Sequence, residues 1–245
     1  MGEEKKEPPL GILIPGSWKE EDQFPGRGAG TWVKIADFTE PAYREAFAEP
    51  NVIQHNYNQG ILIVEGSHAQ IIGNRIAANV KANIGLGGTN SGQTRITHNL
   101  IQESKSEGIF VIEGEQNLEV SYNWVSVNSV GLVLFNTKGT FKQNRMKKNQ
   151  GAGVVILGQT TAVLDGNIIK GGDKYDENSN SNGLQIKDLA EPELRNNKIM
   201  WVKKDLDCEP RKHYKKMMRK IRENNNELRG AGTDNKAGFM NCSVF

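Results

Sequence analysis

Two glutamates occupy equivalent places in the sequence and could act as an acid–base pair. Glu65 follows the apolar run Gly60-Ile-Leu-Ile63, and Glu113 follows Gly108-Ile-Phe-Val111. An inverting glycosidase holds its two carboxyl groups up to about 9.5 Å apart, and stacked strands would place these two about 10 Å apart. Four more residues share this place after an apolar run: Gly88, Asn136, Gly158 and Asp188. Because no Asp-Asp cluster or basic row accompanies them, we expect solvent-exposed turn residues.

A polar loop and the histidines are the other candidates for metal binding. Residues 173–183 read DKYDENSNSNG, but neutral amides replace the charged ligands of a calcium loop, and Leu189 stands where an EF-hand has glutamate. We therefore expect an inserted loop. The histidines lack metal-site spacing, and we interpret them as surface or turn residues: His55, His68, His98 and His213. Two of them, His55 and His98, are expected to share one row just before an asparagine.

Signatures of conventional active sites are missing from the sequence. It contains no Gly-x-Ser-x-Gly, no Gly-x-x-x-x-Gly-Lys-(Ser/Thr) and no His-Glu-x-x-His. The sequence therefore predicts no catalytic residue, no cofactor and no metal. It favours a noncatalytic protein without deciding the question.

The region near the C-terminus differs from the rest of the chain in charge. Residues 203–222 carry nine Lys or Arg against three Asp or Glu. From Pro210 the spacing predicts a basic amphipathic helix, to which we assign residues 203–229. Its apolar side holds Tyr214, Met217, Met218 and Ile221, and its basic side holds Lys212, Lys215, Lys216, Arg219 and Lys220. Such a helix would cap the fold or bind a partner such as an acidic tubulin tail, calmodulin or an anionic lipid.

Residues 230–245 are expected to form a further strand or a tail. Cys242-Ser-Val-Phe245 has the form of a prenylation signal, whereas residues 238–244 resemble a strand, which would prevent that modification. Membrane attachment is expected only if Cys242 is prenylated. The other cysteine, Cys208, is too far away for the paired spacing of a zinc site, which fits reduced thiols.

A sequence repeat must position these residues. The phrase Asn-x-(Ile/Val/Met) occurs six times at intervals of 21 to 30 residues, at Asn74, Asn99, Asn123, Asn144, Asn167 and Asn197. An apolar residue lies three positions before each, and a second apolar run such as Gly131-Leu-Val-Leu134 follows most of them. Each unit therefore holds two or three short strands. An earlier unit begins at Asn51 or Asn56, and the sequence leaves that choice open.

A repeat of about 23 residues with such short strands predicts a solenoid. One unit is too small to bury a core, so each would form a coil whose strands pair in parallel with those of the next coil. We predict an all-β, single-stranded parallel β-helix of about seven coils over residues 30–202, after an irregular segment at 1–29. Asparagine is expected to take left-handed backbone geometry at each corner and to hydrogen-bond along the stack.

The phrase Asn-x-Ile, followed nine residues later by Gly-(Ile/Val)-x-(Val/Ile), resembles the parallel β-helix repeat family. Leu164-Asp-Gly-Asn167-Ile-Ile169 and Gly153-Val-Val-Ile156 are clear copies. The family includes pectin-degrading enzymes, and the closer likeness is to intracellular β-helix domains of F-box-only proteins and of an Shc SH2-binding protein. This resemblance implies a right-handed coil. The sequence shows no F-box-like segment before the repeat, so a role in ubiquitin ligases is not implied.

Composition narrows the function classes. The net charge is +2, and no apolar run has the length of a signal peptide or a membrane span, so we expect an intracellular protein that does not bind nucleic acid. We predict a noncatalytic protein-binding scaffold, a rigid rod in a larger cytoplasmic assembly of the cytoskeletal or ciliary kind. The alternative is a β-helix that binds or degrades a polysaccharide.

Overall fold

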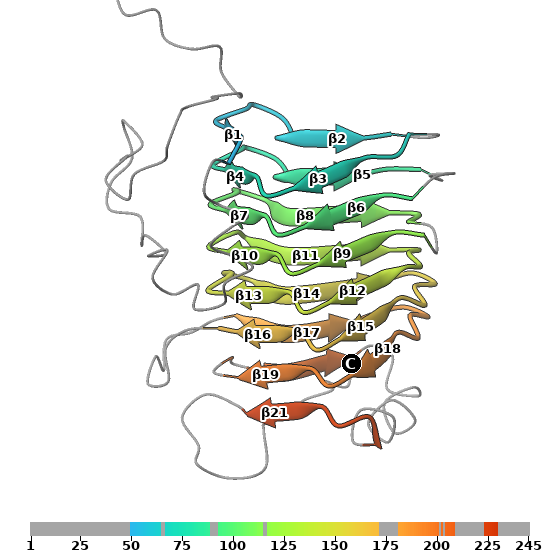
Figure 1. Cartoon of the computed structure of the whole chain (residues 1–245). Coiled ribbons are helices and arrows are strands. Elements are labelled where there is room, and N and C mark those ends of the chain that lie inside the picture. The colour runs from blue at the N-terminus through green and yellow to red at the C-terminus, as the bar shows by residue number, and fades with distance from the viewer. Residues whose placement is uncertain are drawn as a thin grey trace, which may run out of the picture.

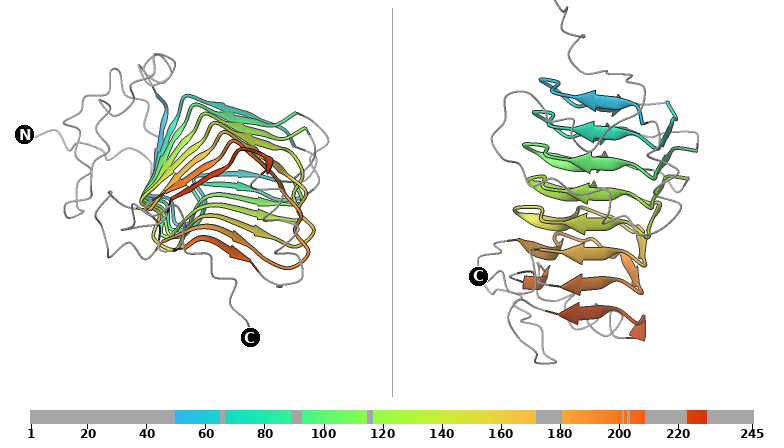
Figure 2. Two further views of the ribbon diagram at one scale, coloured as in Figure 1. Left: turned by 90° about the horizontal axis from the view of Figure 1, so that it is seen from below. Right: turned by 60° about the vertical axis from the view of Figure 1, so that its left-hand side comes forward.

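The polypeptide winds as a solenoid of short strands. The computed structural model describes residues 50–64, 67–88, 93–114, 117–171, 181–200, 202, 204–208 and 223–229. Each coil contributes up to three strands, and equivalent strands of successive coils pair in parallel to form three sheets, which we call sheets A, B and C. Figures 1 and 2 show the coils stacked along one axis with the sheets around a central core.

The strand bounds follow the sequence repeat. Sheet A contains β1 (Val52–Gln54), β4 (Arg75–Ala77), β7 (Leu100–Gln102), β10 (Trp124–Ser126), β13 (Arg145–Lys147), β16 (Ile168–Lys170), β19 (Lys198–Met200) and β21 (Glu227–Arg229). Sheet B contains β2 (Ile61–Ile63), β5 (Ile84–Leu86), β8 (Glu107–Ile112), β11 (Val130–Phe135), β14 (Ala152–Leu157), β17 (Asn182–Ile186) and β20 (Lys204–Cys208). Sheet C contains β3 (Gln70–Ile72), β6 (Arg95–Thr97), β9 (Glu119–Ser121), β12 (Thr140–Lys142), β15 (Val163–Asp165) and β18 (Glu193–Arg195).

The prediction of an all-β parallel β-helix is confirmed. Strands β1 to β18 make six coils with all three strands, and β19 to β21 continue sheets A and B. The pairing keeps equivalent residues in register, so that Ile101 pairs with Ile76 on one side and with Val125 on the other. The repeat therefore places the same kind of residue at the equivalent position of each coil, so that these residues form rows along the rod axis.

The hydrophobic core lies inside the coils, and each strand contributes at least one apolar side chain to it. Side chains alternate between the two faces of a strand, so the middle residue of each three-residue strand points inward. Ile96, Val120, Phe141 and Leu164 form one such row on sheet C, each buried in the core. Because each coil is too small to enclose these side chains, burial depends on the neighbouring coils.

The coils turn at corners where the backbone has positive φ, but the predicted asparagines do not supply this geometry. The residue before each ladder asparagine does so, with φ of 57° at His98 and 54° at Tyr122. Its amide then bonds to the next coil, as Tyr122 N does to Lys142 O at 3.1 Å. The prediction of left-handed asparagines is therefore wrong, because their side chains must point into the corner. His55 belongs to another corner row, with Ala78, so it shares none with His98.

The asparagines form a buried hydrogen-bonded ladder along the corner between sheets C and A. Asn123 shows the pattern: its Oδ1 accepts from the N and Nδ2 of Asn99, both at 3.0 Å. Its Nδ2 donates to Asn144 Oδ1 at 3.0 Å and to Ile96 O at 2.8 Å. The same contacts link all six predicted residues, Asn74, Asn99, Asn123, Asn144, Asn167 and Asn197. The Asn123 amide thus uses its full donor and acceptor capacity.

The ladder is longer than the sequence indicated. Asn51 Nδ2 donates to Asn74 Oδ1 at 2.9 Å, which makes Asn51 the first member and answers the question left open between Asn51 and Asn56. At the other end, Asn197 Nδ2 donates to Asn226 Oδ1 at 2.9 Å. Asn226-Glu-Leu228 departs from the repeat phrase, with Leu in the third place and Glu223 where an apolar residue is expected, so only its interval of 29 residues from Asn197 could have indicated it.

A second polar ladder, which the sequence analysis missed, occupies the corner between sheets A and B. Asn79, Ser104, Asn128 and Asn149 lie five residues after successive members of the first ladder. Asn128 Oδ1 accepts from Ser104 N at 2.9 Å, and Asn128 Nδ2 donates to Asn149 Oδ1 at 3.1 Å. Two amide-rich corners therefore fix the coils against each other.

Two predictions for the C-terminal region are wrong. Strand β20 pairs with β17 and β21 pairs with β19, so the β-helix continues past residue 202, and residues 204–208 and 227–229 are strands rather than helix. The physical reason is that one inward leucine, Leu206 or Leu228, completes each strand while charged residues flank it in the sequence. The centre of the predicted helix, residues 209–222, lies outside the described residues, as do residues 1–49 and 230–245.

Candidate functional site

The outer face of sheet B carries an apolar surface. Between the inward residues of β2, β8, β11 and β14 lie two columns of outward apolar side chains in register. The first column holds Leu62, Phe110, Val133 and Val155, and the second holds Val64, Ile112, Phe135 and Leu157. We call these eight residues the apolar face. Its most open members are Leu62 (56% exposed), Val64 (54%) and Phe135 (37%).

The apolar face has a defined extent. It runs from β2 to β14, four strand spacings of about 4.8 Å each, and its columns lie two residues apart, so it measures about 20 Å along the rod axis and about 7 Å between columns. It ends where Gln185 of β17 pairs with Val155. Gly87 leaves an opening within it, because an added Cβ there would contact nothing within 4 Å. Apolar surface gathered in this way on a folded protein marks binding sites.

The outer face of sheet C is polar instead. Glu119 in β9 lies between two cations, with its carboxylate 2.8 Å from Lys142 Nζ and 3.6 Å from Arg95 Nε. The hydrogen bond from Lys142 is the main cause that holds the pKa of Glu119 below its ordinary value, although burial of the carboxyl opposes this shift. The three side chains form one charged patch across β6, β9 and β12.

This patch gives the fold a small dependence on pH. Since the folded-state pKa of Glu119 is lowered, its stabilising contribution is present above the unfolded pKa of about 4.3 and is lost as pH falls through the lower folded pKa. We expect Glu119→Gln to be less stable than the wild type at pH 7, by under about 1 kcal/mol because the patch is half open to solvent. Urea denaturation at pH 7 and pH 3 tests this. Lys142→Met should behave alike, and a difference that grows toward pH 3 would contradict the assignment.

His98 takes part in a polar network beside this patch. Its ring stacks on Tyr122 at a centroid distance of 5.1 Å, and its Nδ1 lies 2.7 Å from Thr97 Oγ1. Ser121 Oγ connects Thr97 Oγ1, at 3.3 Å, to Glu119 Oε1, at 3.1 Å. Burial lowers the pKa of His98, which favours the neutral ring. These contacts hold the side chains of adjacent coils in place, and we interpret the network as part of the wall of sheet C.

The carboxylate row from the sequence lies at the corner after sheet B. Positive φ occurs at all of its described members: Gly88, Glu113, Asn136, Gly158 and Asp188. Two of the side chains brace the corner, since Asp188 Oδ2 accepts from Gly158 N at 3.0 Å and Asn136 Oδ1 accepts from Gln159 N at 2.9 Å. Glu65 lies outside the described residues, so its distance from the exposed Glu113 is not defined. The described members act as turn residues.

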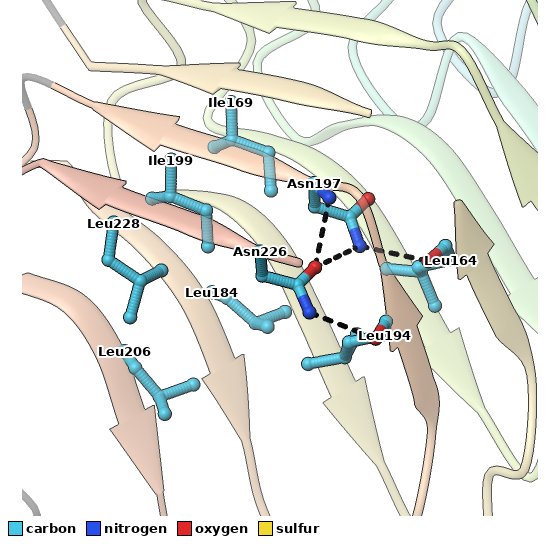
Figure 3. A pocket seen from close by; sticks show the side chains of 9 residues that line it. All are labelled: Leu164, Ile169, Leu184, Leu194, Asn197, Ile199, Leu206, Asn226 and Leu228. Atoms are coloured by element: carbon cyan, nitrogen blue, oxygen red, sulfur yellow. Dashed lines mark hydrogen bonds between the residues drawn. The ribbon is translucent and has the colours of Figure 1, made fainter. Parts of the chain in front are cut away.

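The C-terminal end of the core contains a small hollow that is partly open to solvent. Figure 3 shows its lining, which comes from the last coils: Leu164, Ile169, Leu184, Leu194, Asn197, Ile199, Leu206, Asn226 and Leu228. Its two amides already bond to the ladder and to backbone oxygens, as Asn226 Nδ2 does to Leu194 O at 2.9 Å. The wall that remains for a ligand is apolar, so we interpret the hollow as the incompletely filled end of the core.

Several predicted sites lie outside the described residues. They are the basic contacts Lys212, Lys215, Lys216, Arg219 and Lys220, together with His213 and Cys242. Most of the polar loop also lies outside, and strand β17 already begins at Asn182, so the loop ends earlier than predicted. Of the remaining histidines, His68 is exposed and His55 is half-buried.

The described residues show neither a metal site nor a membrane span. In this part of the chain, no three His, Cys, Asp or Glu side chains gather closely enough to hold a metal ion. Among the same residues, no helix has the length and apolar character needed to cross a bilayer. The apolar face on sheet B is therefore the candidate site that the described geometry supports best.

Comparison with known proteins agrees with the fold. Residues 42–145 match a family model described as a right-handed beta helix region, a span that includes the strands from β1 to β12. No curated protein and no solved structure matches the chain significantly. The match covers less than half of the chain, and together with the strand pairing it shows a right-handed parallel β-helix fold.

Proposed function

We propose that the protein is a noncatalytic scaffold that binds another protein through the apolar face of sheet B. The carrying observation is that eight outward apolar side chains lie in two columns on a rigid wall. An amphipathic helix fits this surface, because a helix about 10–12 Å in diameter covers two columns, and about 13 residues span 20 Å. Its apolar stripe would lie along the rod axis, with side chains entering the opening at Gly87.

The size of the apolar face favours a helix over a second copy of the chain. With side chains included, the face covers on the order of 300 Å², whereas a stable interface buries about 800 Å² on each partner. The wall is preformed by ladder pairing on both sides of each central strand, so binding orders few side chains. A helix in another protein therefore fits better than self-association of this face.

The alternative function is a β-helix that binds or degrades a polysaccharide. It would rest on the pair Glu65 and Glu113, of which the structure describes only the exposed Glu113. A likeness to F-box-only and Shc SH2-binding β-helix domains, a place in a cytoskeletal or ciliary assembly, and a second contact through the basic residues 212–220 are finer parts of the scaffold proposal. The last of these would suit an acidic partner such as a tubulin tail.

Charge substitutions on the apolar face test the proposal. Phe135→Lys removes an open side chain, and Gly87→Lys adds a charge where an added Cβ meets no atom within 4 Å. Ile72→Lys is the matched control, because Ile72 is an exposed apolar residue on the outer face of sheet C. The full-length wild type would be used to capture a binding partner from the source cell, and this partner would be purified. Its affinity for the wild type and for each full-length variant would then be measured.

The binding constants of the purified partner decide the outcome. We expect Phe135→Lys and Gly87→Lys to weaken binding at least about 30-fold, as for loss of an interface hot spot, while Ile72→Lys binds like wild type. Thermal unfolding of each variant would verify that the fold is intact. Equal affinity for all three variants would contradict the proposed site, and turnover of a polysaccharide that depends on Glu113 would favour the alternative function.

A further inference from the structure

The outer face of sheet A is buried over its first four strands. The middle residues of β4, β7 and β10 belong to the core, so the residues beside them point away from it. Six of these outward residues expose no more than 5% of their surface: Val52, Arg75, Ala77, Leu100, Trp124 and Ser126. Outward residues of the first coil on the other sheets are open, with 56% exposed at Leu62 and 49% at Ile72. Neighbouring strands alone therefore do not account for the burial of Val52, which belongs to the same coil.

The burial is confined to one end of the sheet. Farther along sheet A, the outward residues Arg145 and Lys147 of β13 are half-buried, and Lys198 of β19 is exposed. The buried part runs from β1 to β10, three strand spacings, or about 14 Å. The exposure of the outward residues therefore rises along sheet A, and a short chain segment that packs on β1 to β10 would account for this rise.

The position of β1 identifies the segment that can supply the cover. The short stretches 65–66, 89–92 and 115–116 each connect a sheet B strand to a sheet C strand, away from sheet A. Residues 172–180 leave sheet A at β16, beyond the half-buried β13 and away from the buried strands. Residues 209–222 and 230–245 adjoin β20 and β21 at the opposite end of the rod. Residues 1–49 lead directly into β1, the first strand of the buried part. About five extended residues span 14 Å, so this segment is more than long enough.

The sequence of residues 1–49 has the chemistry that the buried face requires. It contains no asparagine, so it cannot extend the asparagine ladders. It contains aromatic residues that match Leu100 and Trp124, namely Trp18, Phe24, Trp32, Phe38, Tyr43 and Phe47. It also contains carboxylates that suit the buried guanidinium of Arg75: Asp37, Glu40, Glu45 and Glu49. We infer that residues 1–49 dock on the outer face of β1, β4, β7 and β10, with Leu100 and Trp124 as apolar anchors.

Site-specific photocrosslinking of the full chain tests this inference. The photoreactive residue p-benzoylphenylalanine would replace Trp124 in one variant and Phe135, an aromatic residue on the apolar face of sheet B, in the control. After illumination, peptide mass spectrometry should find crosslinks from position 124 to residues 1–49, and these crosslinks should be lost when the probe is at position 135. Crosslinks from position 124 to residues 230–245 or to another molecule would overturn the inference.

A second measurement leaves the buried face unmodified. A protease site would be inserted between Glu49 and Pro50, and the folded full chain would be cleaved there before size-exclusion chromatography. The released segment 1–49 is expected to elute with the remainder of the chain, whereas its separation would overturn the inference. Both experiments report the position of residues 1–49 and neither measures binding of a partner protein, so failure here is distinguishable from failure of the proposed function.

Discussion

Replacing Asn123 with alanine is expected to lower the free energy of unfolding by about 3–5 kcal/mol. The side chain makes four buried hydrogen bonds, two as acceptor from Asn99 and two as donor to Asn144 and Ile96. Alanine leaves Asn99 N and Ile96 O without these partners in a place that water does not reach, and each such group costs about 1–3 kcal/mol. Urea denaturation at neutral pH measures the loss.

Asn58→Ala is the matched control for this prediction. Asn58 is an exposed asparagine of the first coil, and we expect a change within about 0.5 kcal/mol on its replacement. If both substitutions changed stability by the same small amount, the asparagine ladder would have no special energetic role. The fold would then depend on its apolar core alone.

Phe141→Ala is expected to cost about 3–5 kcal/mol, because it removes a large side chain and leaves a cavity inside the coil. Phe141 has no exposed surface and packs in the row that continues to Val120 and Leu164. The neighbouring coils are held by strand pairing on both sides, so they cannot close around the cavity. Chemical denaturation would measure the change.

Phe135→Ala provides the comparison for this second prediction. Phe135 is the same residue type in the preceding strand β11, but it points outward with 37% of its surface exposed. We expect it to cost about 1 kcal/mol or less, since little apolar surface leaves the core. Equal losses for Phe135→Ala and Phe141→Ala would contradict the assignment of inner and outer faces.

The sequence predicted the parts of the fold in which one residue type recurs beside an apolar residue. The first asparagine ladder belongs to this group, because each ladder residue is followed two positions later by an inward residue such as Ile101 or Val125. The second ladder has no such companion, and serine replaces asparagine at Ser104, so its period was missed. Strand β20 was missed because only Leu206 marks it as part of the core, whereas its charged neighbours suggested a helix.

The candidate site was only partly accessible from the sequence. The apolar face could be recognised in the sequence. A strand that buries one face needs apolar residues only at alternate positions, whereas runs such as Gly131-Leu-Val-Leu-Phe135 are apolar at inward and outward positions alike. The burial of Trp124 leaves no comparable signal. A tryptophan in an outward position looks exposed in any repeat pattern, and only the three-dimensional structure shows that it is covered.

The most direct test of the scaffold account is hydroxyl-radical footprinting of the full chain, alone and in complex with its purified partner. The account predicts that oxidation of Leu62, Val64 and Phe135 falls on complex formation, because a partner helix covers the apolar face. Oxidation of Ile72, an exposed apolar residue on the outer face of sheet C, should not change. Protection of Ile72 with continued oxidation of Phe135 would contradict the account, because it would place the partner on sheet C.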